Sequence, residues 1–429
     1  MKAKPREDAS RRQLNSIFLC ILWMLLLCIG FTGCGENDIL DEIPRDFVLS
    51  WGVSEESEEA LPPEETSAEE EEKTPRECFL MEEASLYAYD SLNEAEKTWY
   101  RDMEQILGSF GEQMELSGAG LEAGLDESHV DKIFQCVLSD HPELFYVEGY
   151  SYTKYSRGKK LNSIEFSGSY NMDVETALKR REEIAAAVDT LLSGIREDAD
   201  DYEKVKYVYE TLIRNTDYDL NAADNQNIYS VFVHHLSVCQ GYAKATQYLL
   251  NRLGVECTLV LGTVETGEGH AWNLVKVDGD YYYVDTTWGD VSYQTEEPAP
   301  EEGESGLSMP EINYDYLNVT TEELLRTHSI GGAVAMPVCT ATAANYYVRE
   351  GAYFTSYDKE QMKALFQKAA QEGAGDVTIK CSDAACYEEI VSMLIAEQEI
   401  FDYLNEGESQ IAYAQNEKQL SLTFWVTNE

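Results

Sequence analysis

The spacing of apolar and polar positions is most informative in the stretch 239–290. After Cys239, apolar or small residues recur every three or four positions as far as Leu253, and Gly254 follows where a helix would end. This period is typical of a buried amphipathic helix with a glycine cap. The sequence therefore predicts a helix that begins at Cys239 and places its thiol in the first turn.

A hairpin is predicted later in the same stretch. Its arms are 270–277 and 280–285, and Asp278-Gly279 between them is a strong two-residue turn signal. With that turn the arms pair so that Trp272 lies opposite Asp285. A slip by one residue would send every side chain of one arm to the other face, so the register depends on the turn.

The sequence before and after the stretch 239–290 predicts a mixture of helices and strands. Residues 78–197 form an α+β lead-in domain, with helices expected at 92–110, 127–145 and 174–195 and strands at 146–156 and 161–171. A further helix at 201–215 opens the core. Residues 313–429 form a small α+β module, with a strand or turn and a Thr-capped helix within 314–330, a strand-like hairpin at 344–354, helices at 359–373 and 383–401, a strand at 376–381 and a hairpin at 410–426.

Three segments are predicted to lie outside the folded domains. Residues 1–33 combine basic residues with the apolar run 17–31, as a signal peptide does. Residues 34–77 are acidic, contain proline and are poor in apolar residues, which predicts a disordered tether. Residues 296–312 form an acidic loop after the core.

Charge and cysteine usage exclude several classes of protein. The chain has 80 acidic and 32 basic residues and a net charge of −48, so it would repel nucleic acid. An acidic surface favours cationic partners or simply solubility. The cysteines show no disulfide framework and no metal-ligand spacing, and the six histidines are scattered. No metal site and no cofactor are predicted.

Cys239, His270 and Asp285 are the candidate catalytic residues. A helix start favours thiolate over thiol at Cys239. In the predicted register, His270 and Asp285 lie diagonally on one face of the hairpin, roughly 7–8 Å apart at the backbone, which a carboxylate and an imidazole can span. A thiol nucleophile needs such a base, and the base needs a third group to orient it.

Three sequence motifs carry a family resemblance. VCQGYA at 238–243, GHAWNLV at 269–275 and YYYVDTTWGD at 281–290 resemble the core motifs of the transglutaminase-like superfamily of papain-like cysteine enzymes. The family's triad of Cys, His and Asp, in this chain order, falls on the three candidates. The resemblance implies an α+β fold in which residues 198–295 form a papain-like core of N-terminal helices packed on an antiparallel sheet.

The resemblance also implies an activity. Cys239 would attack an amide of a protein or peptide, His270 would move its proton, and Asp285 would hold the imidazole. The backbone N–H of Cys239 would stabilise the oxyanion, and Trp272 and Trp288 are candidates for lining the substrate site. The thioester would pass to water in a peptidase or amidase, or to an amine in a transamidase. An inactive scaffold or binding module at the cell wall is the alternative.

The sequence 31–34, Phe-Thr-Gly-Cys, resembles a bacterial lipobox. This resemblance implies cleavage before Cys34 and attachment of a diacylglycerol to its sulfur, which would anchor the chain to the bacterial cell membrane. An uncleaved N-terminal anchor and an ordinary secreted protein are the other two readings. All three place the folded domains outside the cytoplasm. The sequence does not predict an oligomeric state.

Overall fold

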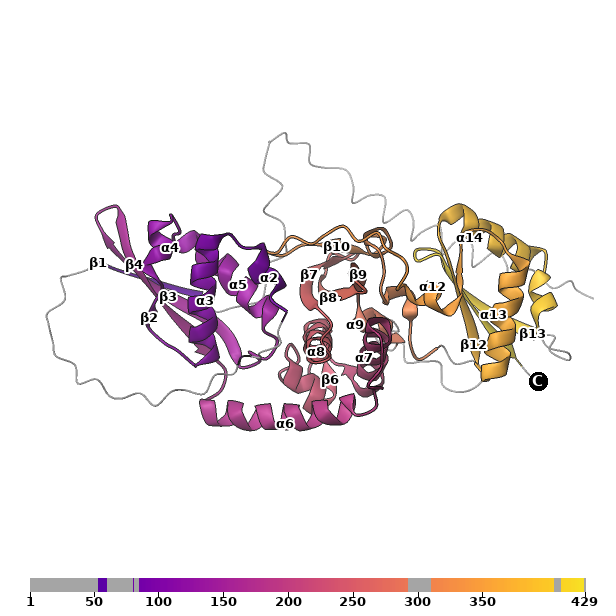
Figure 1. Cartoon of the computed structure of the whole chain (residues 1–429), viewed down its shortest axis with the longest axis horizontal. Coiled ribbons are helices and arrows are strands. Elements are labelled where there is room, and N and C mark those ends of the chain that lie inside the picture. Colours follow the sequence, from indigo (N-terminus) through magenta and orange to yellow (C-terminus); the bar gives the residue numbers. More distant parts are fainter. Residues whose placement is uncertain (1–52, 60–79, 81–84, 292–309, 405–409, 428–429) are drawn as a thin grey trace, which may run out of the picture. The chain divides into compact units, whose positions relative to one another are not determined.

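The computed structural model describes residues 53–59, 80, 85–291, 310–404 and 410–427 (Figure 1). The predicted signal peptide, Cys34, most of the tether and most of the acidic loop lie outside these residues. In the part of the chain that is described, no helix is both long enough and apolar enough to cross a membrane. Helices and strands mix throughout, so the fold is α+β, as predicted.

The lead-in domain is built around a four-stranded sheet in the order β1-β3-β4-β2. The predicted strand pair is present as an antiparallel hairpin of β3 and β4, which turns at Gly158 with a positive φ of 67°. The elements are β1 (Val53–Glu59), α2 (Tyr87–Ser91), α3 (Glu94–Gly108), β2 (Met114–Glu115), α4 (Gly118–Glu122), α5 (Val130–Asp140), β3 (Val147–Arg157), β4 (Lys160–Tyr170) and α6 (Val174–Leu192).

Strand β1 differs from the sequence prediction. Val53–Glu59 lies within the segment 34–77 that was predicted as a disordered tether, yet it pairs in parallel with β3. Edge strands present unpaired N–H and C=O groups that any extended segment can bond, whatever its side chains. Low apolar content therefore did not prevent pairing at these seven residues.

The core contains a second four-stranded sheet, in the order β10-β7-β8-β9. Helix α8 packs against β7 and β8, and α7 packs against α8. The elements are α7 (Asp201–Asn215), β5 (Asp217–Tyr218), a π-helical turn (Ser230–His234), β6 (Leu236–Ser237), α8 (Cys239–Arg252), β7 (Cys257–Val264), β8 (Gly269–Val277), β9 (Asp280–Val284), α9 (Thr286–Gly289), a 3-10 turn (Tyr314–Tyr316), α11 (Thr321–Leu324) and β10 (His328–Ile330).

Strand β10 extends the core further along the chain than the sequence suggested. The sequence analysis assigned residues from 313 onward to the C-terminal module, but β10 pairs with β7 at the edge of the core sheet. Gly262 on β7 permits this approach, because a Cβ there would lie 2.1 Å from the carbonyl oxygen of Ser329. Helix α11 has the predicted threonine cap, since Thr320 accepts a hydrogen bond from the N–H of Glu323.

The C-terminal module has its own sheet, in the order β11-β12-β14-β13. Two predictions in this module are wrong. Residues 344–354 form a helix and a short strand rather than a hairpin, because Asn345 caps α12 and Gly351 ends it with φ of 76°. The predicted helix at 383–401 breaks at Gln398, where φ is 61°. The elements are α12 (Tyr346–Glu350), β11 (Tyr353–Phe354), α13 (Lys359–Glu372), β12 (Asp376–Cys381), α14 (Ala384–Val391), a π-helical turn (Ser392–Ala396), a 3-10 turn (Glu399–Tyr403), β13 (Gln410–Asn416) and β14 (Ser421–Thr427).

Buried apolar side chains form two large clusters. One joins the lead-in domain to the core and includes Trp99, Phe134, Tyr209, Leu249 and Val275. The other belongs to the C-terminal module and includes Phe354, Met362, Ile379, Leu394 and Phe424. Burial of apolar surface therefore ties the first two regions into one unit, while the third has a core of its own.

Candidate active site

Helix α8 positions the candidate nucleophile. It begins at Cys239, and its N-cap residue, Val238, supplies no side-chain hydrogen bond to the first turn. The N–H groups of Gly241 and Tyr242 donate to the carbonyl oxygen of Val238, and the helix dipole favours an anion beside the helix start. Gly241 is required two residues later, because a Cβ there would clash with the Ser237 hydroxyl.

The hairpin of β8 and β9 has the register expected from the sequence. Val277 pairs with Asp280 and Asn273 pairs with Val284. Asp278 and Gly279 have φ values of 52° and 93°, as a turn with two positive φ angles requires. Asp285 follows β9 directly and caps α9, because its Oδ1 accepts a hydrogen bond of 3.1 Å from the N–H of Trp288.

His270 and Asp285 meet on one face of this hairpin. His270 Nε2 donates to Asp285 Oδ2 over 2.7 Å, and both side chains are almost fully buried. The Nδ1 atom of His270 is then available to the thiol. Burial opposes the charged imidazolium, but attraction to Asp285 outweighs it and, with a contribution from Cys239, raises the pKa of His270 to about 10.

The same charges act on the carboxylate. Burial alone would raise the pKa of Asp285, but the charge of His270 and the hydrogen bonds from His270 and His328 hold it well below its usual range. Asp285 is therefore ionised and His270 protonated near neutral pH. His270 also lies next to Cys239 and can exchange a proton with its thiol.

His328 is a buried histidine that the sequence analysis did not single out. It lies on β10, and its Nε2 donates to Asp285 Oδ2 over 3.0 Å, so two imidazoles share one carboxylate oxygen. His328 follows Asp285 by 43 residues. A His-Ser-Ile strand carries no local signal of such a role, and only the pairing of β10 with β7 reveals it.

These three side chains could also hold a metal ion. Among the described residues, His270, Asp285 and His328 form the one group whose ligand atoms lie close enough together, all within 4.8 Å. Zinc prefers unprotonated imidazole nitrogens at roughly 2.0–2.1 Å. Here both Nε2 atoms lie at hydrogen-bond distances from one oxygen, which requires an N–H on each. The geometry is that of a hydrogen-bonded triad.

Two tryptophans pack around the imidazoles. Trp272 is fully buried, and its ring centroid lies 5.9 Å from that of His270 and 5.0 Å from that of His328. Trp288 is half-buried, with its centroid 6.1 Å from His270 and 4.7 Å from His328. These rings exclude water from the ion pair. Contact of either ring with a substrate stays a prediction.

Further contacts fix α8 against the hairpin. Asn273 Nδ2 on β8 donates to the carbonyl oxygen of Ala243 over 2.9 Å, and the hydroxyls of Thr246 and Thr286 lie 2.8 Å apart. Cys239 itself packs among Ala243, Leu259 and Ala271, and 3% of it is exposed. The site is therefore rigidly held and largely dry.

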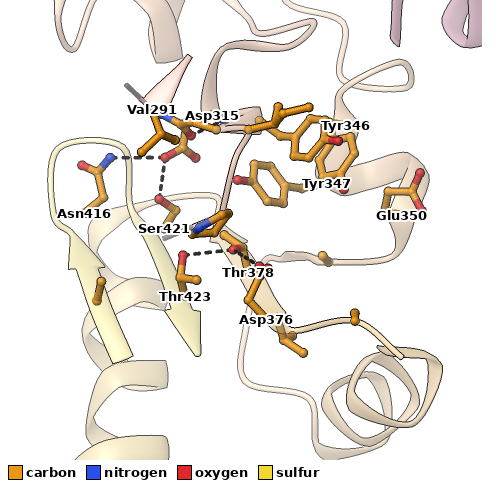
Figure 2. A pocket seen from close by; sticks show the side chains of 18 of the residues that line it. Val291, Asp315, Tyr346, Tyr347, Glu350, Asp376, Thr378, Asn416, Ser421 and Thr423 are labelled. Carbon is orange, nitrogen blue, oxygen red and sulfur yellow. Dashed lines mark hydrogen bonds between the residues drawn. The ribbon is translucent and has the colours of Figure 1, made fainter. Parts of the chain in front are cut away.

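A separate cleft of about 840 Å³ lies between the core and the C-terminal module (Figure 2). Asp315 lines it from the core side, and Tyr346, Asp376, Ser421 and Thr423 line it from the module. None of Cys239, His270 and Asp285 is among the residues that line it. This cleft is not the space around the thiol.

Known proteins share this arrangement in part. The family model described as the transglutaminase-like superfamily matches residues 189–286. The human kyphoscoliosis peptidase is 27% identical over 121 residues, which are 24% of this chain and 18% of that protein. Its mouse counterpart is 26% identical over 123 residues, covering 25% and 19%. The match thus spans less than a fifth of these relatives.

Two solved structures also resemble the chain. One is the crystal structure of a TGase, with 15% identity, a TM-score of 0.25 and coverage of 38% of this chain and 57% of that one. The other is the periplasmic domain of TgpA from Pseudomonas aeruginosa bound to ethylmercury, with 16% identity, a TM-score of 0.19 and coverage of 30% and 56%.

Proposed function

Because residues 189–286 belong to the transglutaminase-like superfamily, we propose that this protein is a cysteine enzyme acting on amides of proteins or peptides. The observation that supports it most directly is the 2.7 Å bond between His270 Nε2 and Asp285 Oδ2, next to a thiol that interacts with His270. A nucleophile, a base and an orienting carboxylate are thereby supplied by one helix and one hairpin.

In the first half of the reaction, the thiolate of Cys239 attacks the amide carbon. A C–S bond forms and negative charge moves onto the carbonyl oxygen, where the backbone N–H of Cys239, at the start of α8, stabilises it. The protonated His270 gives its Nδ1 proton to the leaving nitrogen as the C–N bond breaks. Asp285 keeps the other nitrogen protonated and in place throughout.

In the second half, the thioester is resolved by an acceptor. Neutral His270 takes a proton from water or from an amine, and the acceptor attacks the thioester carbon and releases the thiolate. Water makes the protein a peptidase or amidase, and an amine makes it a transamidase. We favour hydrolysis, because many bacterial proteins with this type of core are regarded as peptidases.

The test begins with an electrophilic activity probe applied to cells that carry the wild type or Cys239→Ala. The wild type should be labelled at Cys239, and proteins or peptides that are cleaved or cross-linked only in wild-type cells identify the substrate. Adding a fluorescent primary amine then separates the two acceptors, since only a transamidase incorporates it. No labelling of Cys239 and no difference between the two proteomes would contradict an enzymatic role.

An inactive scaffold is the second candidate, and one observation favours it. With 3% of Cys239 exposed, an amide cannot reach the sulfur without movement of the surrounding side chains. A scaffold has no need of a reactive thiol, so labelling of Cys239 by the probe in the folded protein decides between the two.

The location of the protein is part of the same proposal. Attachment of a lipid to Cys34 would hold the enzyme on the outer side of the bacterial cell membrane, where protein and peptide amides are accessible. The support for it is the lipobox-like sequence 31–34 after the apolar run 17–31.

A further inference from the structure

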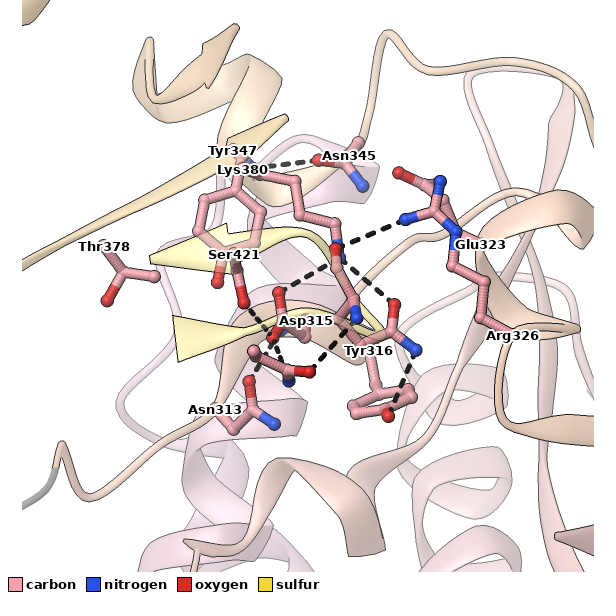
Figure 3. A network of polar contacts seen from close by, with 12 residues as sticks. Asn313, Asp315, Tyr316, Glu323, Arg326, Asn345, Tyr347, Thr378, Lys380 and Ser421 are labelled. Carbon is pink, nitrogen blue, oxygen red and sulfur yellow. Dashed lines mark hydrogen bonds and ion pairs between the residues drawn. The ribbon is translucent and has the colours of Figure 1, made fainter. Parts of the chain in front are cut away.

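A buried polar network connects the C-terminal module to Asp285. It starts at Lys380 on β12, whose side chain is fully buried. Its ammonium donates to Asp315 Oδ1 over 3.1 Å and to Gln419 Oε1 over 3.2 Å (Figure 3). A buried ammonium has three hydrogens and no acceptor, so the groups that face it must present oxygen.

Lys380 therefore fixes the orientation of the Gln419 amide. With Oε1 held by the ammonium, the Nε2 group points the other way and donates to the Tyr316 hydroxyl over 3.2 Å and to Thr327 Oγ1 over 3.3 Å. The flipped amide would place its own N–H groups against the ammonium. Gln419 is 1% exposed, so water does not offer an alternative partner.

Thr327 in turn determines which ring nitrogen of His328 carries a hydrogen. A hydroxyl has one hydrogen to give and two lone pairs that accept. Because Thr327 Oγ1 accepts from Gln419, its hydrogen goes to the nearest acceptor, His328 Nδ1, at 2.8 Å. The other two acceptors lie farther away, the Tyr316 hydroxyl at 3.3 Å and the carbonyl oxygen of Leu324 at 3.5 Å. With Nδ1 accepting, His328 carries its hydrogen on Nε2 and donates it to Asp285 Oδ2.

We propose that His328 is a positioning residue of the active site, held as the neutral tautomer with hydrogen on Nε2 by the relay Lys380–Gln419–Thr327. The proposal rests on the function proposed above. His328 does not touch the reacting atoms. It donates a second hydrogen bond to the carboxylate oxygen that His270 contacts, and its neutrality leaves His270 as the single positive partner of Asp285. The family match ends at residue 286, before every member of this relay.

Nuclear magnetic resonance tests the tautomer directly. In the purified full chain labelled with ¹⁵N-histidine, the two ring nitrogens of His328, assigned by their loss in His328→Gln, should show an unprotonated Nδ1 and a protonated Nε2. The variant Thr327→Val removes the hydroxyl at nearly constant shape, and the His328 signals should then move towards a mixture of tautomers. Thr327→Ser, which keeps the hydroxyl, should resemble the wild type.

Alkylation of Cys239 by iodoacetamide across a range of pH tests the effect on the active site without any amide substrate. His328→Leu should slow alkylation near pH 6 on the order of tenfold, because it removes a hydrogen bond to a charged group. His328→Gln, whose Nε2 can still donate to Asp285, should restore the rate to within about twofold. Melting curves exclude variants that fail to fold.

Two results would overturn the proposal. One is a wild-type His328 that is protonated on both nitrogens or on Nδ1 alone. The other is an unchanged alkylation profile in a folded His328→Leu. Neither result depends on turnover, so absence of amidase activity with the expected tautomer and profile would count against the proposed function only.

Discussion

Asp285 accepts three hydrogen bonds through two oxygens: two from imidazoles at Oδ2 and one from the N–H of Trp288 at Oδ1. Together these three hydrogen bonds hold the carboxylate in one orientation. Rotation of the carboxylate would break them. The arrangement of this site therefore depends on the negative charge of Asp285.

Substitution of Asp285 by asparagine is expected to lower turnover strongly. Asp285→Asn keeps the shape, but its Nδ2 group cannot accept from an imidazole, so the useful tautomer of His270 is lost. We expect a loss on the order of 10²–10³-fold, or about 3–4 kcal/mol in the barrier. The control is Asp280→Asn, since Asp280 is exposed beside the turn. Equal activity of the two folded variants would contradict the role of Asp285.

Thiol reactivity should separate Cys239 from the other buried cysteines. Burial raises the pKa of Cys136 to about 12 and raises that of Cys257 well above its usual value. Cys239 differs from both, because it lies at a helix start beside His270. At pH 6 a small alkylating reagent should therefore modify Cys239 first in the folded protein, as mass spectrometry would show. Equal rates at the three sites would favour the scaffold.

The pair of His270 and Asp285 should make stability depend on pH. The pKa of His270 is raised to about 10 in the folded state, so its contribution is complete below about pH 6.5 and is lost as the pH rises through 10. Asp285 has a lowered pKa, so its contribution is present above about pH 3.8 and is lost as the pH falls.

Urea unfolding between pH 7 and pH 10 measures the alkaline side. The free energy of unfolding should fall more steeply in the wild type than in His270→Gln. His141 also has a pKa raised to about 10, because Glu143 and Glu104 outweigh its burial, but it is present in both proteins. The difference between the two slopes therefore belongs to His270. Parallel curves would mean that the ion pair does not stabilise the fold.

At the scale of single elements, strand β10 is the one that completes the site. It brings His328 to Asp285, and its approach depends on Gly262. An added Cβ at Gly262 would meet the carbonyl oxygen of Ser329 and, at 2.5 Å, the ring of Trp272. Steric contact of this kind is costly, since neither the backbone of one strand nor a fully buried indole can move freely.

Gly262→Ala should therefore destabilise the protein by about 1–3 kcal/mol and slow alkylation of Cys239, because β10 moves away from β7. The matched control is Gly331→Ala, where an added Cβ would have ordinary contacts at 3.5 Å and beyond. Chemical denaturation of both variants measures the stability. If Gly262→Ala had the stability of the wild type and its Cys239 were alkylated at the same rate, the position of β10 would not be needed for the site.

The hairpin of β8 and β9 could be predicted from sequence because its cause is local. Asp278-Gly279 sets the turn, and the turn sets which residues face each other. The position of His328 could not be predicted from the sequence. It depends on the pairing of β10 with β7 and on the contact at Gly262, which join residues far apart in the chain. Helix α12 was missed for a third reason, since its strand-like composition concealed the cap at Asn345 and the stop at Gly351.

At the scale of the whole molecule, the chain combines a strongly acidic composition with a sequence that resembles a lipid-attachment site. A net charge of −48 keeps the domains soluble and away from anionic surfaces. Retention at a membrane would then need an anchor, either a lipid on Cys34 or the apolar run 17–31.

Cys34→Ser should abolish incorporation of labelled fatty acid and leave an unprocessed or released protein. Metabolic labelling of cells that express each form measures this directly. Cys28→Ser, within the apolar run, is the control and should be labelled like the wild type. Continued uptake of fatty acid by Cys34→Ser would contradict the proposed anchor.

The order of the relay residues Thr327, Lys380 and Gln419 along the chain has a consequence for biosynthesis. Asp285 precedes His328 by 43 residues, and Thr327 precedes Gln419 by 92. A nascent chain therefore exposes the nucleophile, its base and the carboxylate to the surroundings well before the C-terminal module has been made. With the proposed relay, the tautomer of His328 is set only once the C-terminal module that carries Gln419 has folded against the core. Acyl chemistry would thus wait for the C-terminal module.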